Sequence, residues 1–490
     1  MNESQMRPFP EKIHIPDWNT FVKKMNETDI SVIDMLDNTN PDAKDEFLTD
    51  KGLSKPKNEY GKLDIKRVEQ NIKTIISLKK ELELSEIPEK RRVLAARILD
   101  DNLKKNRFVH ASYLYNHASH DGRAEAAEEH RKANIALYGE PDEDVFWSIL
   151  AEKLSSIPAE NLQGEDKIMY SEVLEMIGPL RGADCRIFRP QKETVEWFSD
   201  AIEIFFEGFL AHIPEGQQEF SIEEACVVTN EIIRSEFGQD AAAGTCAGDT
   251  YAGTYAGTCT GDTCAGTDAD IMAKDADRAA SLDTTGWKAV VIPSGAVAST
   301  DCEQKLIRFP GKRSRGAYTR KELKAIIIHE LGVHALRSLP YESCGIKSFS
   351  LGIPGYEAFE EGVAKAAEQA VNRQYEDSGL LHYISIGLAY FLGKNFREVF
   401  EIQRRLEHLT KGEPAGRCFD SVQRTFRGTS ELPNHKDLIY YNGANQVWKY
   451  IEEHLNDAEL MEQLFLNGKT SMINKAHERM VYEMRTGGYL

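Results

Sequence analysis

The chain has 490 residues, of which 41% are hydrophobic and 28% charged, so it is long enough for about two or three domains with substantial cores. Its 60 basic and 79 acidic residues give a net charge of -19, which disfavours a nucleic acid or an acidic polypeptide as a partner because both would be repelled. No basic-then-apolar leader opens the chain and no apolar run reaches the length of a membrane span, so we expect a cytoplasmic protein without membrane association.

The first part of the chain divides into two predicted regions. Residues 1–58 are polar and contain five prolines, so we expect a loosely packed lead-in arm. Residues 59–170 alternate charged residues with apolar residues at helical spacing and are predicted to form a helical region. Four histidines in this region have spacings that do not suggest a shared metal, and we interpret them as solvated or capping residues: His110, His117, His120 and His130.

Residues 171–490 are predicted to form a catalytic domain that contains a low-complexity insertion. Apolar periodicity indicates two helices between residues 192 and 237. Residues 241–283 then include repeated Ala-Gly-Thr units with few large apolar groups, so we interpret them as a flexible insertion that cannot bury enough surface to order itself. Two short apolar runs follow, at residues 287–293 and 305–310, and predict a pair of strands. The eight cysteines match neither a zinc ribbon nor a disulfide framework, and we expect reduced thiols.

The helix that follows these strands is the most informative part of the sequence. Thr319 and Glu322 have the spacing of a capping box, and an apolar stripe continues from there, so the helix is predicted to begin at Thr319. Glycines and prolines between residues 340 and 355 end it and reverse the chain. A second helix is predicted to begin near Tyr356 and to carry Glu360 and Glu361 in its first turns.

The first of these helices contains the sequence His-Glu-Leu-Gly-Val-His, with His329 and His334 five positions apart. Histidines four apart are separated by about 400° and share one face of a helix, whereas histidines five apart are separated by about 500° and splay by roughly 140°. Both can bind one metal only if the helix accommodates an extra residue in this turn, as a π-bulge does. Gly332 lies between them and favours such a distortion because it carries no Cβ.

The residue types in this pattern point to metal-dependent hydrolysis. Two imidazoles and a carboxylate suit Zn²⁺ and leave a fourth position for water, so we predict one zinc per chain. Periodicity does not distinguish Glu360 from Glu361 as the third ligand. Glu330, next to the first histidine, is the candidate general base that takes a proton from the metal-activated water and delivers it to the leaving amine. Any one of these histidines alone would suggest a core residue, but the whole set favours a metal site.

The His-Glu-x-Gly-x-His helix followed by Glu-Gly-Val-Ala at 361–364 resembles the microtubule-associated tyrosine carboxypeptidase family and the related bacterial domain with a Gln-Glu-Gly-Leu-Ala motif. The resemblance is strongest over residues 305–445 and includes the segment 388–406. The bacterial motif differs at two positions that remove no predicted ligand, Glu360 for Gln and Val363 for Leu. A further matching stretch contains Arg427-Gly428, Lys436-Asp437, Tyr440 and Gly443.

The resemblance implies a zinc metallopeptidase in which His329, His334 and Glu361 bind the metal and Glu330 is the general base and acid. The substrate is then the C-terminus of a peptide or protein, with aromatic terminal residues among the candidates. A carboxypeptidase also needs a cation and a donor for its substrate. The candidates that rest largely on the resemblance are Arg337, Arg427 and Tyr440. We do not expect tubulin as the substrate, because its acidic tails would meet a chain of net charge -19.

The expected fold is α+β and mainly α, with a helical N-terminal region and a zincin-like catalytic domain whose small sheet lies beside the His-Glu-x-x-x-His helix. The predicted function is that of a metalloprotease of the carboxypeptidase type. Dipeptidyl-peptidase three also has a six-residue motif of this kind, but its second motif differs. Two other functions remain open, a non-catalytic metal-stabilised regulatory or binding protein and a zinc amidohydrolase of a small substrate. Glu330 favours an enzyme over a structural site, because structural zinc sites need no base.

Overall fold

A computed structural model describes residues 17–61, 63–182, 187–237, 286–293, 297–312, 315–342, 350–411 and 415–485. The predicted insertion at 241–283 lies outside the described residues. The chain forms two compact units, the first made of residues 1–189 and 377–442 and the second of residues 190–376 and 443–490. The predicted boundaries at residues 58 and 170 differ from this division, because residues 377–442 belong to the first unit. Helices predominate and the sheets are small, as expected for a mainly helical α+β protein.

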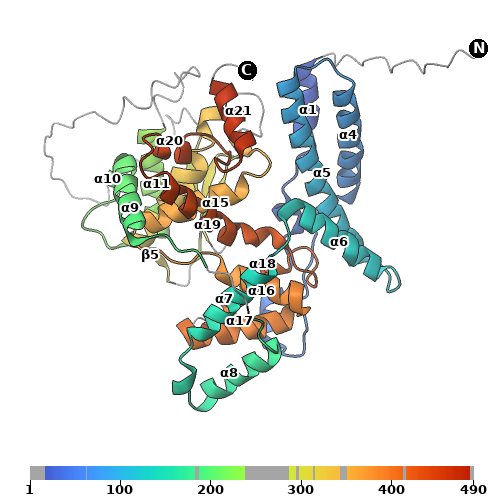
Figure 1. The fold of residues 1–490 in the computed structure, drawn as a ribbon, viewed down its shortest axis with the longest axis vertical. Helices are drawn as coiled ribbons and strands as arrows, with labels where there is room; N and C mark the ends of the chain where they lie inside the picture. The colour runs from blue at the N-terminus through green and yellow to red at the C-terminus, as the bar shows by residue number, and fades with distance from the viewer. Residues whose placement is uncertain are drawn as a thin grey trace, which may run out of the picture. The chain divides into compact units, whose positions relative to one another are not determined.

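The described part of the first unit consists of helices joined by loops (Figure 1). In chain order these are α1 (Trp18–Glu27), α2 (Val32–Leu36), α3 (Ala43–Thr49), α4 (Ile65–Glu83), α5 (Glu89–His117), α6 (Arg123–Tyr138), α7 (Glu143–Ser155), η1 (Ala159–Asn161), α8 (Gly164–Ile177), α16 (Leu380–Leu392), α17 (Phe396–Lys411), α18 (Ala415–Thr425) and η5 (His435–Asp437). α19 (Leu438–Glu453) begins in this unit, and its residues from Gly443 onward belong to the second unit.

Residues 17–58 differ from the loosely packed arm that their proline content predicted. They form three short helices, and Pro41 and Pro56 lie in the connections that follow α2 and α3. The apolar side of these helices is buried, with Phe21, Met25 and Phe47 at most 2% exposed. The prolines therefore lie between the helices and do not prevent them, because proline is tolerated between elements and disfavoured in their interiors.

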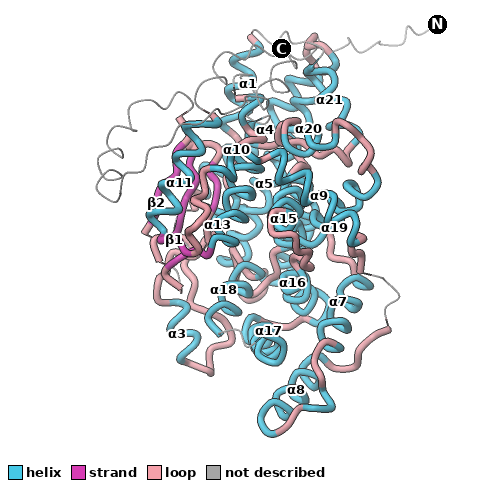
Figure 2. The backbone as a smooth tube through the Cα atoms, turned by 90° about the vertical axis from the view of Figure 1, so that its left-hand side faces the viewer, coloured by secondary structure: helices cyan, strands magenta, loops and turns pink. Residues whose placement is uncertain are grey.

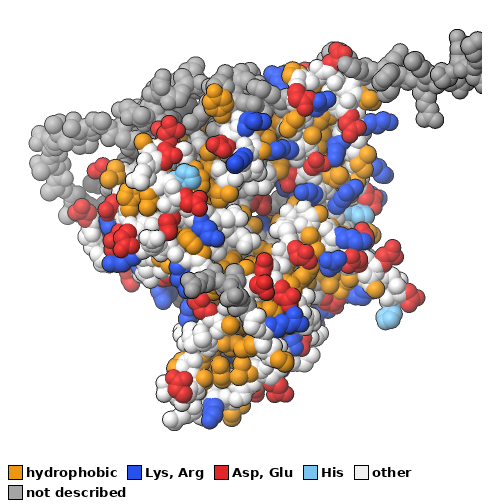
Figure 3. All heavy atoms as spheres, in the orientation of Figure 1, with side chains coloured by type: hydrophobic (Ala, Val, Ile, Leu, Met, Phe, Trp, Pro, Cys, Tyr) orange, Lys and Arg blue, Asp and Glu red, His pale blue; other side chains and the backbone are white. Residues whose placement is uncertain are grey.

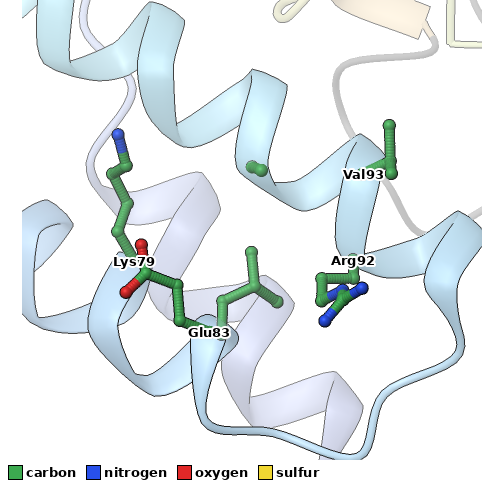
Figure 4. A pocket seen from close by; sticks show the side chains of 6 residues that line it. Lys79, Glu83, Arg92 and Val93 are labelled. Carbon is green, nitrogen blue, oxygen red and sulfur yellow. The ribbon is translucent and has the colours of Figure 1, made fainter.

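The helices α4 and α5 pack side by side, and acidic and basic side chains are interspersed over the surface that they form with α6 (Figure 3). One exposed ion pair joins Arg131 Nε to Glu128 Oε2 at 2.8 Å within a single turn of α6. A shallow pocket lies near the turn between α4 and α5 (Figure 4), and it contains none of the predicted site residues. It is lined by Lys79, Leu82, Glu83, Arg92, Val93 and Ala96.

The four histidines of this region do not all behave as predicted. His120 is exposed, and a ring nitrogen of His117 lies 2.9 Å from the carbonyl oxygen of Tyr113. The prediction is wrong for His130, which is 1% exposed and packs against Phe108 with 5.1 Å between the ring centroids. The sequence spacing gave no sign of this burial, because His130 faces the core only through the way α5 and α6 pack together.

No described helix is both long and apolar enough to cross a membrane. The most apolar of the described helices is α16 (Leu380–Leu392). Its side chains Tyr383, Ile384, Ile386 and Leu388 are buried in the core of the first unit together with residues of α7, α17 and α18. The apolar run is therefore explained by packing within the protein.

The second unit combines helices with two small sheets, and Figure 2 shows the strands in magenta beside α11 and α13. Its helices are α9 (Lys192–Phe205), α10 (Glu207–Ala211), α11 (Ile222–Glu236), α13 (Arg320–Ile326), η3 (Ile327–Ala335), η4 (Leu339–Tyr341), α15 (Glu357–Ala370), α20 (Leu460–Phe465) and α21 (Lys475–Arg485). Its strands are β1 (Glu219–Ser221), β2 (Lys288–Ile292), β3 (Ser299–Asp301), β4 (Leu306–Pro310) and β5 (Ala317–Thr319).

The two predicted strands are β2 and β4, which pair with each other in parallel. β3 pairs with the other side of β4 in antiparallel register, so the strand order is β2-β4-β3. β1 and β5 form a separate antiparallel pair, in which β5 directly precedes α13. The sheet order makes β2 and β3 the two edges, and β3 packs against η3, the helix that carries the predicted metal ligands.

Candidate metal centre

The helix that carries the two histidines begins as predicted. The side chain of Thr319 accepts a hydrogen bond from the backbone N–H of Glu322 at 3.2 Å, and Glu322 Oε2 accepts one from the backbone N–H of Thr319 at 2.8 Å. This reciprocal capping box satisfies two N–H groups that a helix start leaves without partners. It fixes the first turn of α13, which continues without a break into η3.

The segment η3 (Ile327–Ala335) is a π-helix, so the distortion predicted from the histidine spacing is confirmed. The backbone bonds of a π-helix join residues five apart, which brings His329 and His334 onto one face. Their ring centroids are 5.0 Å apart and the rings are inclined by 68°. The two imidazoles are therefore neighbours, whereas a regular α-helix would splay them.

Gly332 has a second role in this helix besides easing the distortion. A Cβ at this position would lie 2.9 Å from the Phe206 ring, closer than side-chain carbons approach each other. Phe206, at the end of α9, is 1% exposed and packs directly on the π-helix. The missing Cβ thus lets an aromatic ring support the turn that holds both histidines.

α15 (Glu357–Ala370) carries the two adjacent glutamates, and their positions separate the alternatives that periodicity left open. One carboxylate oxygen of Glu361 lies 4.0 Å from His329 Nε2. His329, His334 and Glu361 each offer a donor atom, and these atoms lie within 4.8 Å of one another. Glu360 is 2% exposed and instead faces the far side of the His334 ring. Among the described residues, this is the one cluster of histidine, cysteine and carboxylate groups with metal-binding geometry.

The glycine after Glu361 is required by close helix packing. A Cβ at Gly362 would lie 2.2 Å from the carbonyl oxygen of Gly443, and a Cβ at Gly443 would lie 1.9 Å from the carbonyl oxygen of Ala358. The backbones of α15 and α19 therefore touch at these two glycines. Because Gly362 follows Glu361 directly, the contact determines where α15 presents its carboxylate.

Each histidine has a carboxylate within hydrogen-bond distance of its Nδ1 atom. Glu368 Oε2 lies 3.0 Å from His329 Nδ1, and Glu360 Oε1 lies 2.8 Å from His334 Nδ1. An Nδ1–H that donates to a carboxylate leaves the lone pair of Nε2 free for a metal and holds the ring in one orientation. Neither carboxylate was predicted to have this role. Glu368 had a signal in the sequence, since it is seven residues after Glu361 and so lies on the same helix face.

Cations keep these two carboxylates ionised. Burial opposes the charge on Glu360, but Lys469, His334 and Arg337 outweigh it and lower its pKa. Burial likewise opposes the charge on Glu368, but the hydrogen bond from His329 and the charge of Lys365 lower its pKa to about 2. Both groups are therefore carboxylates at neutral pH and accept hydrogen bonds from the imidazoles.

Glu330 lies next to the first histidine and is 8% exposed. The Thr300 hydroxyl reaches two acceptors of this residue, the carboxylate Oε2 at 2.8 Å and the backbone carbonyl at 2.9 Å. Thr300 is the central residue of β3, so the edge strand holds the Glu330 side chain in place. The sequence gave no sign of this partner, which comes from a strand 30 residues away.

The donor set fits a zinc ion. Two imidazole nitrogens and one carboxylate oxygen are the ligands of many catalytic zinc sites and leave a position open for water. The 4.0 Å between His329 Nε2 and Glu361 Oε2 is slightly longer than the about 3.3 Å that separates two ligands of a tetrahedral zinc, so a small side-chain movement brings both into contact. The hydrogen bonds at both Nδ1 atoms provide the orientation that such sites require.

The predicted substrate-binding residues have other partners in the structure. Arg337 is fully buried, and its guanidinium donates to the carbonyl oxygen of Thr470 at 2.6 Å and to Glu360 Oε2 at 3.2 Å. Its burial argues against the predicted contact with a substrate carboxylate, because the contacts of its guanidinium are within the protein. Arg427 and Tyr440 lie in the first unit, and their role in substrate binding stays a prediction. Arg427 pairs with Asp37 at 3.0 Å, and the Tyr440 hydroxyl accepts a bond from Arg424 at 2.8 Å.

Residues 291–489 match the model of the family described as microtubule-associated tyrosine carboxypeptidase. No curated protein and no solved structure matches the chain. The matched part begins in β2 and includes η3, α15 and the C-terminal helices, so it contains the three donor residues and Glu330. The motif resemblance is confirmed by this match, which covers residues 291–489.

Proposed function

We propose that the protein is a zinc-dependent carboxypeptidase that removes C-terminal residues, tyrosine among them, from a peptide or protein. The observation that carries this proposal is the cluster of His329, His334 and Glu361 next to Glu330, within the part of the chain that matches a carboxypeptidase family. Zinc bound by these three residues would polarise the scissile carbonyl and lower the pKa of a water toward neutrality.

The residues around the cluster support this use. Glu368 and Glu360 hold the Nδ1 atoms of the two histidines, so both Nε2 atoms are left for the metal. α15 supplies Glu361 on a backbone that is locked against α19 at Gly362. The ligands therefore need little reorganisation on binding, which favours affinity.

Glu330 is the residue we assign to proton transfer. In the proposed reaction its carboxylate takes a proton from the attacking water and then donates it to the nitrogen of the leaving residue as the peptide bond breaks. The Thr300 hydroxyl donates a hydrogen bond to Oε2 of this carboxylate, so we assign the proton transfer to the other oxygen. The side chain is nearly buried, which keeps bulk water from competing for that proton.

The two edges of the sheet suggest how a peptide would bind. At β2, the amide of Asn230 accepts from the backbone N–H of Ala289 at 2.8 Å and donates to its carbonyl at 3.1 Å, so a side chain covers part of this edge. Among the described residues no backbone group bonds to the outer edge of β3, the strand that holds Glu330 through Thr300. We propose that the substrate backbone pairs with β3 by strand addition.

The proposed function is tested by metal content and turnover together. Purified wild-type protein should contain about one zinc per chain by elemental mass spectrometry, and His329→Ala should contain none. A peptide library with varied C-termini, read by mass spectrometry, should show loss of single terminal residues. Glu330→Gln should keep its zinc and lose turnover by about 10²- to 10⁴-fold. A wild-type protein that binds no zinc after reconstitution, or a Glu330→Gln variant with normal turnover, would contradict the proposal.

Strand addition has a separate test that leaves the protein unchanged. Peptide substrates in which one backbone N–H near the C-terminus is replaced by an ester oxygen or is N-methylated lose one strand hydrogen bond. We expect KM to rise several-fold at alternate positions along the peptide, because successive N–H groups of a strand point to opposite sides. A uniform effect at every position would argue against pairing with β3.

A further inference from the structure

Lys469 is far from the metal motif in sequence, but its ammonium group is connected through one carboxylate to His334, one of the predicted ligands. The Lys469 side chain is 4% exposed, and Nζ contacts Oε1 of Glu360, which is 3% exposed. The same Oε1 atom bonds to Nδ1 of His334. A chain of three groups therefore runs from Lys469 through Glu360 to His334.

The segment around Lys469 is held in place on several sides. The backbone N–H of Ile353 donates to the carbonyl oxygen of Lys469 at 3.0 Å. Arg337 donates to the carbonyl oxygens of Leu464 and Thr470, on both sides of the lysine. The Lys469 ammonium thus reaches Glu360 from a fixed backbone between α20 and α21 rather than from a free tail.

Burying this ion pair is unfavourable in free energy, which suggests that the pair has a function other than stability. Bringing an ammonium group and a carboxylate into a protein interior removes both from water, and their mutual attraction rarely repays that loss in stability. Here the carboxylate also contacts the imidazole of His334, which belongs to the donor cluster with His329 and Glu361. Fixing an ionised carboxylate at Nδ1 raises the basicity of the ring and fixes its orientation, which strengthens its bond to a metal.

We propose that Lys469 is a positioning residue of the metal centre. It holds Glu360 in the orientation that fixes His334, so the segment between α20 and α21 sets the affinity of the site for zinc. Arg337 assists from the other carboxylate oxygen, at 3.2 Å. The inference rests on the proposed function, and it adds a residue that neither the motif nor its spacing points to.

The test measures zinc affinity by competition with a chromophoric chelator, in parallel with folding by circular dichroism. Lys469→Met keeps the length of the side chain and removes its charge, and we expect zinc to bind about 10- to 100-fold more weakly. Turnover should fall at limiting zinc and recover at saturating zinc. The matched control is Lys475→Met, at an exposed lysine at the start of α21, which should bind zinc as the wild type does.

The double variant Glu360→Gln/Lys469→Met separates positioning from stability. Removing both charges relieves the unpaired buried charge of each single variant, so the midpoint of unfolding should rise above both. Zinc affinity should stay as low as in Glu360→Gln, because the carboxylate that holds His334 is absent. Recovery of wild-type affinity together with stability would overturn the proposal and leave the ion pair with a structural role. If Lys469→Met does not fold, the zinc affinity of the double variant still tests the proposal.

Failure of this inference is distinguishable from failure of the proposed function. A wild-type protein that binds no zinc contradicts the function and with it the inference. A wild-type protein that binds zinc, together with a folded Lys469→Met variant of equal affinity, overturns only the role of Lys469.

Discussion

Two pairs of histidines in the protein, one partly buried and one fully buried, have different surroundings. In the second unit, His329 and His334 each have a carboxylate at Nδ1, and both belong to one donor cluster with Glu361. In the first unit, His130 and His435 are at most 1% exposed, and the buried Nε2 atom of each has no hydrogen-bond partner among the described residues. Aromatic rings pack against both members of this second pair, Phe108 on His130 and Tyr390 on His435.

The two pairs of histidines therefore have different chemical roles, although the residue type is the same. Burial lowers the pKa of His130 to about 3 and that of His435 to about 4, so both are neutral at physiological pH and act as core residues. His329 and His334 are oriented by anions, which prepares their free nitrogens for a cation. Burial alone therefore does not make a histidine a ligand. The carboxylates that face it decide its role.

The largest expected difference between the two pairs is in metal binding. His334→Ala removes one of three donors and should reduce bound zinc to background at stoichiometric metal. His130→Phe should keep the wild-type zinc content, because His130 is not part of the donor cluster and packs among aromatic rings. Elemental mass spectrometry of both purified variants checks this, and loss of zinc from His130→Phe would contradict the comparison.

Gly362→Ala should disturb the metal centre without changing a ligand. The added Cβ would meet the carbonyl oxygen of Gly443 at 2.2 Å, so α15 and α19 must separate and move Glu361. We expect a loss of stability of about 1–3 kcal/mol and much weaker zinc binding. The control is Gly416→Ala, in helix α18, where the nearest atoms to a new Cβ are those of Lys44 at 3.6 Å and no destabilisation is expected. Urea unfolding and chelator competition measure the two effects, and a Gly362→Ala variant with unchanged zinc affinity would refute the packing argument.

The carboxylates of Glu360 and Glu368 should contribute unequally to zinc affinity. The Glu368 side chain is 32% exposed, whereas that of Glu360 is 3% exposed and contacts two buried cations. Solvent can replace part of the contact that Glu368 makes, so Glu368→Gln should weaken zinc binding only several-fold, less than Glu360→Gln. Competition with the same chelator ranks the two variants, and the reverse order would show that exposure does not control this contribution.

A separate difference between the pairs is a pH dependence of stability that belongs to the first pair. The folded pKa values of His130 and His435 lie below the ordinary value of 6.5, so below that pH the unfolded chain binds more protons and stability falls as the pH is lowered. The loss approaches about 1.4 kcal/mol per pH unit for each histidine and continues to about pH 4. Carboxylates with lowered pKa values, such as Asp437, lose their contribution only at lower pH.

Urea unfolding between pH 7 and pH 4.5 measures this slope. His130→Phe should reduce the slope, whereas His120→Gln, at an exposed position, should leave it unchanged. Equal slopes for the wild type and His130→Phe would mean that His130 does not control the acid sensitivity of the first unit.

Local patterns in the sequence predicted much of the part that contains the candidate metal centre. The capping box at Thr319, the π-helical turn between His329 and His334 and the strands β2 and β4 each depend on residues close together in the chain. Such features are determined by backbone hydrogen bonding and side-chain periodicity, which a short segment carries by itself. The choice of Glu361 over Glu360 came from a family resemblance, because both positions begin the same helix and periodicity treats them alike.

The sequence by itself determined which residue types could bind a metal and where their helices begin. Only the tertiary structure decided what surrounds them: Thr300 on Glu330, Glu360 and Glu368 on the histidines, and Lys469 on Glu360. It also decided that Arg337 is buried and that residues 377–442 join the first unit. These facts depend on contacts between segments far apart in the chain. The free energy of such contacts comes from desolvation and packing in three dimensions, and no local pattern encodes it.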